Sequence, residues 1–348
     1  MAIQISDIMT LVLPLFIILI GCELFTNGIE WLGVKLGLTE SATGSVLAAV
    51  GTALPETMVP IIAIISATNA SSEIAEGAIL GAPFMLATLA MLVGGISILV
   101  AHKKGRRPAT LKVSKEHISL DIKSFLFAYS FAIIAGLLLQ GPNDVARILR
   151  YIIAISLFVF YAVYIRKMIR HESKKCDAPD SLYFTRAFSE RRKKAPSTLA
   201  VLVQVIASLG MIILGAKIFV GGIETVSAEV GISSIMLAFL IAPIATELPE
   251  KFNSVLWYWR GKDTLALGNI TGAMVFQSSI PVSIGLLFTD WALWWINIAS
   301  MFFAMAAILL IYLELRTYKV LSYKSLMFSG VFYIAYVVLI FLYPPPIA

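Results

Sequence analysis

Ten long apolar runs divide the sequence, and short polar links separate them. Only 14% of the residues are charged and 59% are hydrophobic, whereas about a quarter of the residues in a soluble domain are charged. A chain of this composition has too little polar surface to face water, so we predict an all-α integral membrane protein with about ten transmembrane helices. The runs cover residues 8–28, 40–66, 75–101, 119–140, 146–169, 198–222, 230–257, 264–288, 291–314 and 322–343.

Basic residues are sorted to one side of these runs, which a soluble helical bundle would not require. By the positive-inside rule that side is cytoplasmic, and both termini are then extracellular. The net charge of +6 is therefore interpreted as juxtamembrane charge and not as a nucleic-acid surface. Arg147 and Arg150 are exceptions, because they lie near the outer end of the fifth run. The basic links after the third, seventh and ninth runs contain Lys103, Lys104, Arg106, Arg107, Lys112, Lys115, Arg260, Lys262, Arg316, Lys319 and Lys324.

One link is much longer than the others. Residues 171–197 are polar and include the basic run Arg191-Arg-Lys-Lys194, so we predict a cytoplasmic linker there. It separates a first five-helix unit, residues 1–170, from a second, residues 198–348. The two cysteines, Cys22 and Cys176, fall in an apolar run and in the linker, which predicts neither a disulfide nor a thiol metal site. We expect a multi-pass protein of the cell membrane whose partners are the bilayer and transported cations, with no bound cofactor.

The two units contain similar sequences in the same register. Since each unit has five spans, an odd number, the second copy enters the membrane from the opposite side, as in the inverted repeats of secondary transporters. The first matching pair is Gly21-Cys-Glu-Leu-Phe-Thr-Asn-Gly-Ile-Glu30 with Gly215-Ala-Lys-Ile-Phe-Val-Gly-Gly-Ile-Glu224. At the same offset Thr52-Ala-Leu-Pro-Glu56 aligns with Thr246-Glu-Leu-Pro-Glu250, and after a three-residue deletion Gly77-Ala-Ile-Leu-Gly81 aligns with Gly268-Asn-Ile-Thr-Gly272.

The paired Thr-x-Leu-Pro-Glu segments interrupt their spans near the middle. Proline lacks a backbone donor, so Pro55 and Pro249 leave carbonyl groups without their helical partner. A carboxylate at that depth is costly unless it has a partner. Hydroxyl, carbonyl and carboxylate oxygens are hard ligands for Na⁺ or Ca²⁺, or a place for a proton. The alternative is a kinked helix with a protonated, hydrogen-bonded glutamate, which two symmetric copies make less attractive.

Other polar residues lie beside these segments. The two Gly-xxx-Gly pairs are expected to let a neighbouring helix approach closely. Gln277 follows the second pair and either contributes an amide oxygen to the site or forms an interhelical hydrogen bond.

At this point the chain resembles the sodium/calcium exchanger membrane region, a family within the cation/Ca²⁺ exchanger superfamily. The family has a G-T-S-L-P-E-like segment followed by a G-N-x-x-G-S-N-I-F-N/D-like segment in each of two inverted halves. The resemblance implies alternating access, with spans one and six sliding past a fixed core. It implies acidic ligands at Glu56 and Glu250 and hydroxyl ligands at Thr52 and Thr246. The matching segments here begin at Gly51 and Glu76 in the first half and at Ala245 and Leu267 in the second.

Several positions depart from the family pattern. Ala53 and Glu247 stand at the serine of the first segment, Ala82 and Ala273 at the serine of the second, and Leu86 and Gln277 at its final Asn/Asp. Because Ca²⁺ takes six to eight oxygens, a Ca²⁺ site would have to draw on a different ligand set. That set is Glu56, Glu247, Glu250, Thr52, Thr246, Gln277 and backbone carbonyls.

Two lysines add positive charge near the motifs. Lys251 follows Glu250 directly and either neutralises Glu247 at i,i+4 or extends towards the cytoplasm. Lys217, the equivalent of Glu23, either pairs with a carboxylate or lies near the outer interface. A lysine beside the carboxylates would lower the charge of the site and favour a monovalent ion or a proton over Ca²⁺.

We therefore expect a secondary cation antiporter, Na⁺/Ca²⁺ by resemblance, with a cation/H⁺ exchanger carrying another cation as the alternative. A channel is less compatible with an inverted repeat, and the linker is too short for a receptor domain. An intramembrane enzyme is disfavoured, since His102, His117 and His171 all lie in or next to the cytoplasmic links and form no hydrolase motif.

Overall fold

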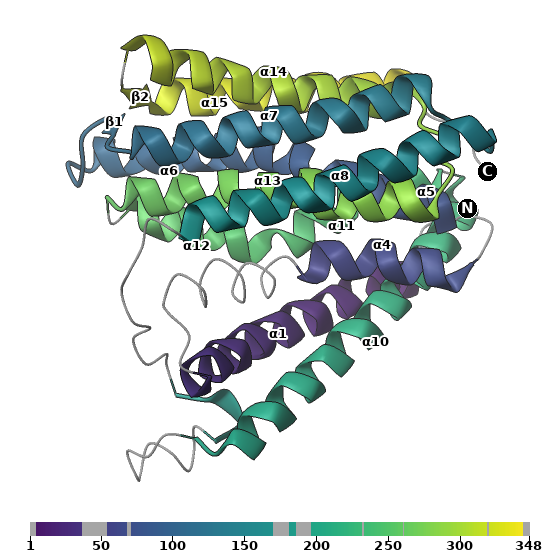
Figure 1. The fold of residues 1–348 in the computed structure, drawn as a ribbon. Helices are drawn as coiled ribbons and strands as arrows, with labels where there is room; N and C mark the ends of the chain where they lie inside the picture. Colours follow the sequence, from purple (N-terminus) through teal and green to yellow (C-terminus); the bar gives the residue numbers. More distant parts are fainter. Residues whose placement is uncertain are drawn as a thin grey trace.

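The structure, a computed structural model, describes residues 5–36, 54–67, 71–169, 181–185, 196–231, 233–259, 261–318 and 320–343. These residues are almost entirely helical, as Figure 1 shows. In the first half they form α1 (Ile5–Lys35), α4 (Leu54–Ser66), α5 (Ser71–Met85), the π-helix η2 (Leu86–Ala90), α6 (Met91–Lys103), β1 (Thr110–Leu111), α7 (Lys115–Leu138) and α8 (Asp144–Ile169). The turn η3 (Tyr183–Thr185) precedes α10 (Thr198–Val230), α11 (Ser234–Thr246), α12 (Leu248–Trp259), α13 (Asp263–Phe288), α14 (Trp295–Tyr318), β2 (Leu321–Ser322) and α15 (Tyr323–Leu342).

The helices coincide with the predicted apolar runs. Within the described ranges, eight continuous helical segments are long and apolar enough to cross a membrane, and α4 is a shorter apolar helix. The third run is a single span made of α5, η2 and α6. The seventh run contains two short helices, α11 and α12, which meet at Glu247. The prediction of an all-α membrane protein is confirmed, while the total of ten spans stays a prediction.

The break between α11 and α12 follows from the local sequence. Pro249 is the second residue of α12, a position at which proline suits a helix because no donor is needed there. The same residue cannot bond to the carbonyl four positions back, so the last turn of α11 cannot continue regularly. In the first half, α4 likewise starts its described part with Leu-Pro-Glu.

Two helices, α1 and α10, lie side by side along the lower edge of Figure 1, inclined to the rest. Glycines bring their backbones close together. A Cβ on Gly21 would lie 2.9 Å from Ile212 Cγ1, and one on Gly215 would lie 2.8 Å from Ile18 Cγ1. As the residue numbers rise along α1, the numbers of the residues that they contact fall along α10, so the two helices are antiparallel.

These contacts obey one symmetry. Gly21 and Gly215 differ by 194 positions, and so do their partners Ile18 and Ile212. The sequence repeat has the same offset. In each contact the glycine of one copy packs against the isoleucine of the other copy, so the two contacts are equivalent. Two inverted copies would produce this arrangement.

Both helices of this pair extend beyond the predicted runs, which ended at residues 28 and 222. The prediction ended them where polar residues begin, but packing continues past that point. Ile29 and Trp31 in α1 and Val226 in α10 are buried. The helix α10 continues to Val230, and Gly231 caps it in the left-handed conformation with a φ of 71°.

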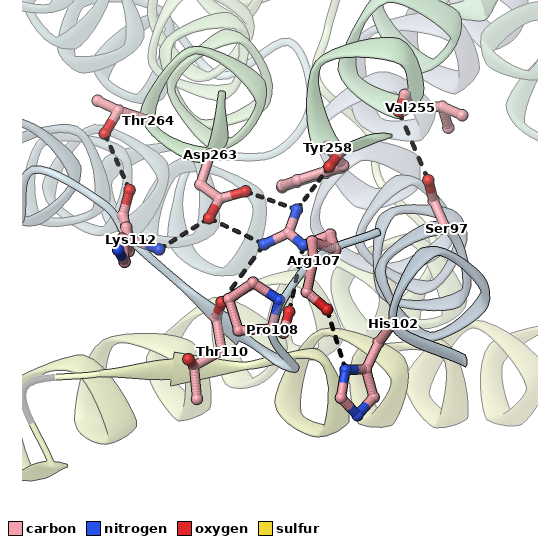
Figure 2. Close-up of polar contacts among 10 residues, drawn as sticks. All are labelled: Ser97, His102, Arg107, Pro108, Thr110, Lys112, Val255, Tyr258, Asp263 and Thr264. Carbon is pink, nitrogen blue, oxygen red and sulfur yellow. Dashed lines mark hydrogen bonds and ion pairs between the residues drawn. The ribbon is translucent and has the colours of Figure 1, made fainter. Parts of the chain in front are cut away.

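The links after the third, seventh and ninth predicted spans meet at one end of the molecule. Strand β1 in the first link pairs antiparallel with β2 in the last. Arg107 forms an ion pair with Asp263 at 2.7 Å, and both side chains are buried. Figure 2 shows the guanidinium between the Asp263 carboxylate and the carbonyl of Tyr258, to which it also donates. The prediction that these basic links share one side agrees with this arrangement.

At the opposite end of the molecule, the contacts of Arg150 explain why this basic residue is an exception to the positive-inside rule. Arg150 is almost fully buried, and its Nη1 donates to the carbonyls of Leu139, Gly141 and Asp290 at 2.6–2.9 Å. It therefore satisfies carbonyls at the end of α7 and in the links α7–α8 and α13–α14. Arg147 is exposed and pairs with Asp144 in the first turn of α8.

Candidate functional site

The first predicted carboxylate, Glu56, lies in the first turn of α4 and is only 4% exposed. An acidic side chain in a first helical turn is favoured by the helix dipole. The helix α4 contacts α5 of the first half and α10 and α13 of the second, so Glu56 is buried on a helix that packs against both halves. A buried carboxylate at this depth is what a cation site in the first half requires.

The break between α11 and α12 forms the corresponding part of the second half. Glu247 occupies the break and is fully buried. Its backbone N–H donates to the carbonyl of Pro243 at 3.2 Å. The Nζ of Lys251 lies 3.1 Å from Glu247 Oε2. Of the two alternatives for Lys251, pairing with Glu247 is therefore the one that the structure contains.

The end of α11 also presents backbone oxygens. Because Pro249 has no N–H, the carbonyl of Ala245 does not receive the usual helical bond. The carboxyl ends of interrupted membrane helices carry partial negative charge and coordinate cations in secondary transporters. The buried Glu247 and these carbonyls together form an oxygen-rich segment within an apolar helix.

Helix α13 lies next to both half-sites, since it contacts α4 and α12. It carries Gln277, which is 1% exposed. Its Oε1 accepts no hydrogen bond from any residue in the described part of the chain. Among the described residues this oxygen therefore takes no part in the interhelical hydrogen bond that was the alternative for Gln277, and its role as a ligand stays a prediction. In the second turn of α13, Asn269 Nδ2 donates to Ser254 Oγ on α12 at 3.2 Å.

Of the described glycines in the two predicted Gly-xxx-Gly pairs, only Gly81 packs tightly against a neighbouring helix. A Cβ on Gly81 of α5 would lie 2.6 Å from the carbonyl oxygen of Phe239 and 2.7 Å from Pro243 Cγ on α11. The prediction of close approach is confirmed there. It is wrong for Gly268 and Gly272, where the nearest atoms, from Ile118 and Tyr164, are 3.9 Å away, because a larger side chain would fit at those positions.

Some predicted site residues lie outside the described part. Thr52 is among the residues not described, and the structure describes the backbone but not the side chains of Thr246 and Glu250. Their roles stay predictions. Lys217 lies exposed on α10 and forms no ion pair with a described residue, so pairing with a described carboxylate is not its role.

Two further buried carboxylates were missed as site candidates. Glu76 on α5 is 3% exposed and contacts Thr289 and the backbone of Ala292. Asp121 on α7 is 2% exposed and accepts hydrogen bonds from Tyr164 on α8 at 2.9 Å and Thr271 on α13 at 2.7 Å. An acidic residue inside an apolar run was the available signal for both. Among the described residues, no three or more His, Cys, Asp or Glu side chains gather as a metal cluster.

Comparison with known proteins agrees with this architecture. The model of the sodium/calcium exchanger protein family matches residues 6–169 and 200–342, which is most of the chain and includes both copies of the motif. The chain belongs to the sodium/calcium exchanger family. This is a family of membrane transporters and not of enzymes, so the chain is a multi-pass transporter of the cation antiporter type.

Two curated relatives extend along most of the chain. A candidate antiporter named CaxA from Alkalimonas amylolytica is 23% identical over 273 residues, covering 78% of each chain. An uncharacterised membrane protein of Methanocaldococcus jannaschii is 22% identical over 324 residues, covering 93% of this chain and 94% of its own.

Solved structures share the fold. The H⁺/Ca²⁺ exchanger CAX has a TM-score of 0.74 at 16% identity and matches 97% of this chain and 82% of its own. The sodium-calcium exchanger NCX_Mj has a TM-score of 0.57 at 20% identity and matches 97% of this chain and 99% of its own. At these identities the likeness shows the exchanger fold and leaves the ions open.

Proposed function

We propose that this protein is a secondary active antiporter that exchanges cations by alternating access, with Na⁺/Ca²⁺ exchange as the reaction that the family favours. The observation that carries the proposal is the interrupted membrane segment at Glu247, with a buried carboxylate between two half-helices. Oxygen ligands inside a membrane are costly without a cation or proton to bind.

The site is proposed to combine both halves. Glu56 with Thr52 would supply carboxylate and hydroxyl oxygens from the first half. Glu250, Thr246 and Glu247 would supply them from the second, and Gln277 would add an amide oxygen from α13, the helix that contacts both α4 and α12. Hard oxygen ligands of this kind suit Na⁺ and Ca²⁺.

The test is ion flux in proteoliposomes that contain the purified full-length protein. An outward Na⁺ gradient should drive Ca²⁺ uptake, and Glu56→Gln and Glu250→Gln should each abolish it while the protein elutes and melts as the wild type does. Glu116→Gln, which alters an exposed carboxylate in the first turn of α7, is the matched control. Normal transport in both site variants would remove the proposal.

A cation/H⁺ exchanger that carries an ion other than Ca²⁺ is the second candidate, since the Lys251–Glu247 ion pair places a positive charge in the second motif. Flux driven by a pH gradient without Na⁺ would favour it. Counterflow distinguishes either exchanger from a channel, because only a carrier accelerates the uptake of labelled ion when unlabelled ion is present inside.

A further inference from the structure

Lys251 directly follows the second motif, where a positively charged side chain is least expected beside a proposed cation site. Its side chain is 9% exposed and that of its partner Glu247 is fully buried. Each charge taken out of water costs several kcal/mol, and the attraction between the two does not always recover that cost. A pair of apolar side chains would hold α11 and α12 together at least as well, so packing alone does not account for the two charges.

The ammonium group points towards the break between the helices. Its Nζ lies 3.1 Å from Glu247 Oε2 and 3.4 Å from the carbonyl oxygen of Pro243. The helix α12 ends at Trp259, eight residues further along, or about 12 Å away at 1.5 Å per residue. A lysine that extended to the membrane surface would point the other way. The Lys251 ammonium group instead contacts the carboxylate of Glu247 and the carbonyl oxygen of Pro243.

The first copy of the motif lacks this pair. Ala53 and Thr57 occupy the positions that correspond to Glu247 and Lys251, so the acid and the base are present together in one half only. The pair adds no net charge to the second motif, but it places a positive charge next to the position where the family has a serine hydroxyl.

We propose that the Lys251 ammonium group pairs with Glu247, competes with transported cations for its oxygens, and lowers the affinity of the site for divalent relative to monovalent cations. This inference rests on the proposed function, because it assigns the ion selectivity of that same site. Repulsion between two charges grows with their product. A divalent ion bound near the ammonium group is therefore penalised about twice as much as a monovalent ion in the same position.

The experiment compares two variants with the wild type. Lys251→Met keeps most of the side-chain volume and exposes the Glu247 carboxylate to incoming ions. The double variant E247S/K251T removes both charges, introduces the serine of the family motif and matches the threonine of the first copy. It leaves no buried charge without a partner, so it tests the proposal even if the single variant does not fold.

The measurement is the concentration of Na⁺ and of Ca²⁺ that half-saturates both the thermal stabilisation of the purified protein and its flux in liposomes. We expect the Ca²⁺ value to fall by about tenfold or more relative to the Na⁺ value in Lys251→Met, and to fall by less in the double variant. Lys115→Met, an exposed lysine at the start of α7, should leave the ratio unchanged.

Two failures are distinguishable. If the wild type transports cations but the Ca²⁺ to Na⁺ ratio is unchanged in both variants, Lys251 has no role in selection and this inference is wrong. If the wild type binds and exchanges no cation, and Glu56→Gln changes nothing, the proposed function itself is wrong.

Discussion

The α1–α10 pair and the bundle formed by the other helices are held together by different kinds of contact. Through the middle of the pair, glycines place the two backbones against each other and against apolar side chains. The bundle is linked by buried ions at both ends, with Arg107 and Asp263 at one end and Arg150 at the other. Asp121 adds a buried link between α7, α8 and α13.

This difference bears on movement. A shift of two smooth apolar surfaces breaks few directional bonds, whereas a shift within the bundle would leave buried charges without partners. The link between α12, which contains Glu250, and α13, which contains Gln277, is held by the ion pair of Asp263 with Arg107. The contacts therefore favour a bundle whose helices stay together, held by buried ions, beside a helix pair held by apolar packing.

The largest expected effect on stability comes from removing the buried ion pair at one end of the bundle. Asp263→Ala leaves the guanidinium of Arg107 buried without its carboxylate (Figure 2), which typically costs about 3–5 kcal/mol. Thermal unfolding in detergent should show a clear drop in melting temperature. An unchanged melting temperature would mean that this ion pair does not hold the α12–α13 link.

The next effect tests the smooth surface of the pair. A Cβ on Gly222 would lie 2.7 Å from the carbonyl oxygen of Thr10, and backbone cannot move aside easily. Gly222→Ala should cost about 1–3 kcal/mol and slow cation exchange by about tenfold, which corresponds to about 1.4 kcal/mol in the barrier.

The neighbouring glycine is its control. A Cβ on Gly221 meets no atom within 4 Å, so Gly221→Ala should preserve both transport and stability, with a small gain because alanine favours a helix. Equal rates in the two variants would show that the close approach of α1 and α10 is not needed for exchange.

A smaller effect is expected where the linker meets the pair. The hydroxyl of Tyr183 donates to Glu23 Oε1 at 2.7 Å, and its backbone N–H donates to Asn27 Oδ1. Tyr183→Phe removes one hydrogen bond, worth about 1 kcal/mol. Limited proteolysis should then cut the linker faster while the melting temperature of the bundle stays the same. A cleavage rate equal to that of the wild type would contradict a docking role for this contact.

The smallest effect is expected at an exposed ion pair, which serves as a reference for the buried pair of Arg107 and Asp263. Arg147 and Asp144 form an ion pair with exposed side chains, and such pairs contribute about 0–1 kcal/mol. Asp144→Asn should leave the melting temperature nearly unchanged. A loss as large as that of Asp263→Ala would show that burial is not what separates the two ion pairs.

Much of the fold was predictable because apolar runs and prolines act locally. Every described α-helix lies mostly within a predicted run, and Pro249 predicted that the seventh run is interrupted. The π-helix η2 at Leu86–Ala90 and the β1–β2 pair were not predicted. Both depend on neighbours distant in sequence, since η2 packs against α14 and α15 and each strand needs the other.

For the site, residue types and spacing identified the acidic positions, and the structure shows that Glu56 and Glu247 are buried, while their role as ligands stays a prediction. The sequence by itself determined that this protein lies in a membrane, that its halves repeat and that its motifs contain prolines and carboxylates, because hydropathy, repetition and proline geometry are properties of the chain. Only the tertiary structure decided where Lys251 points and that Arg150 is buried. Those outcomes depend on which carboxylate or carbonyl oxygens lie within reach, and packing alone brings these groups together.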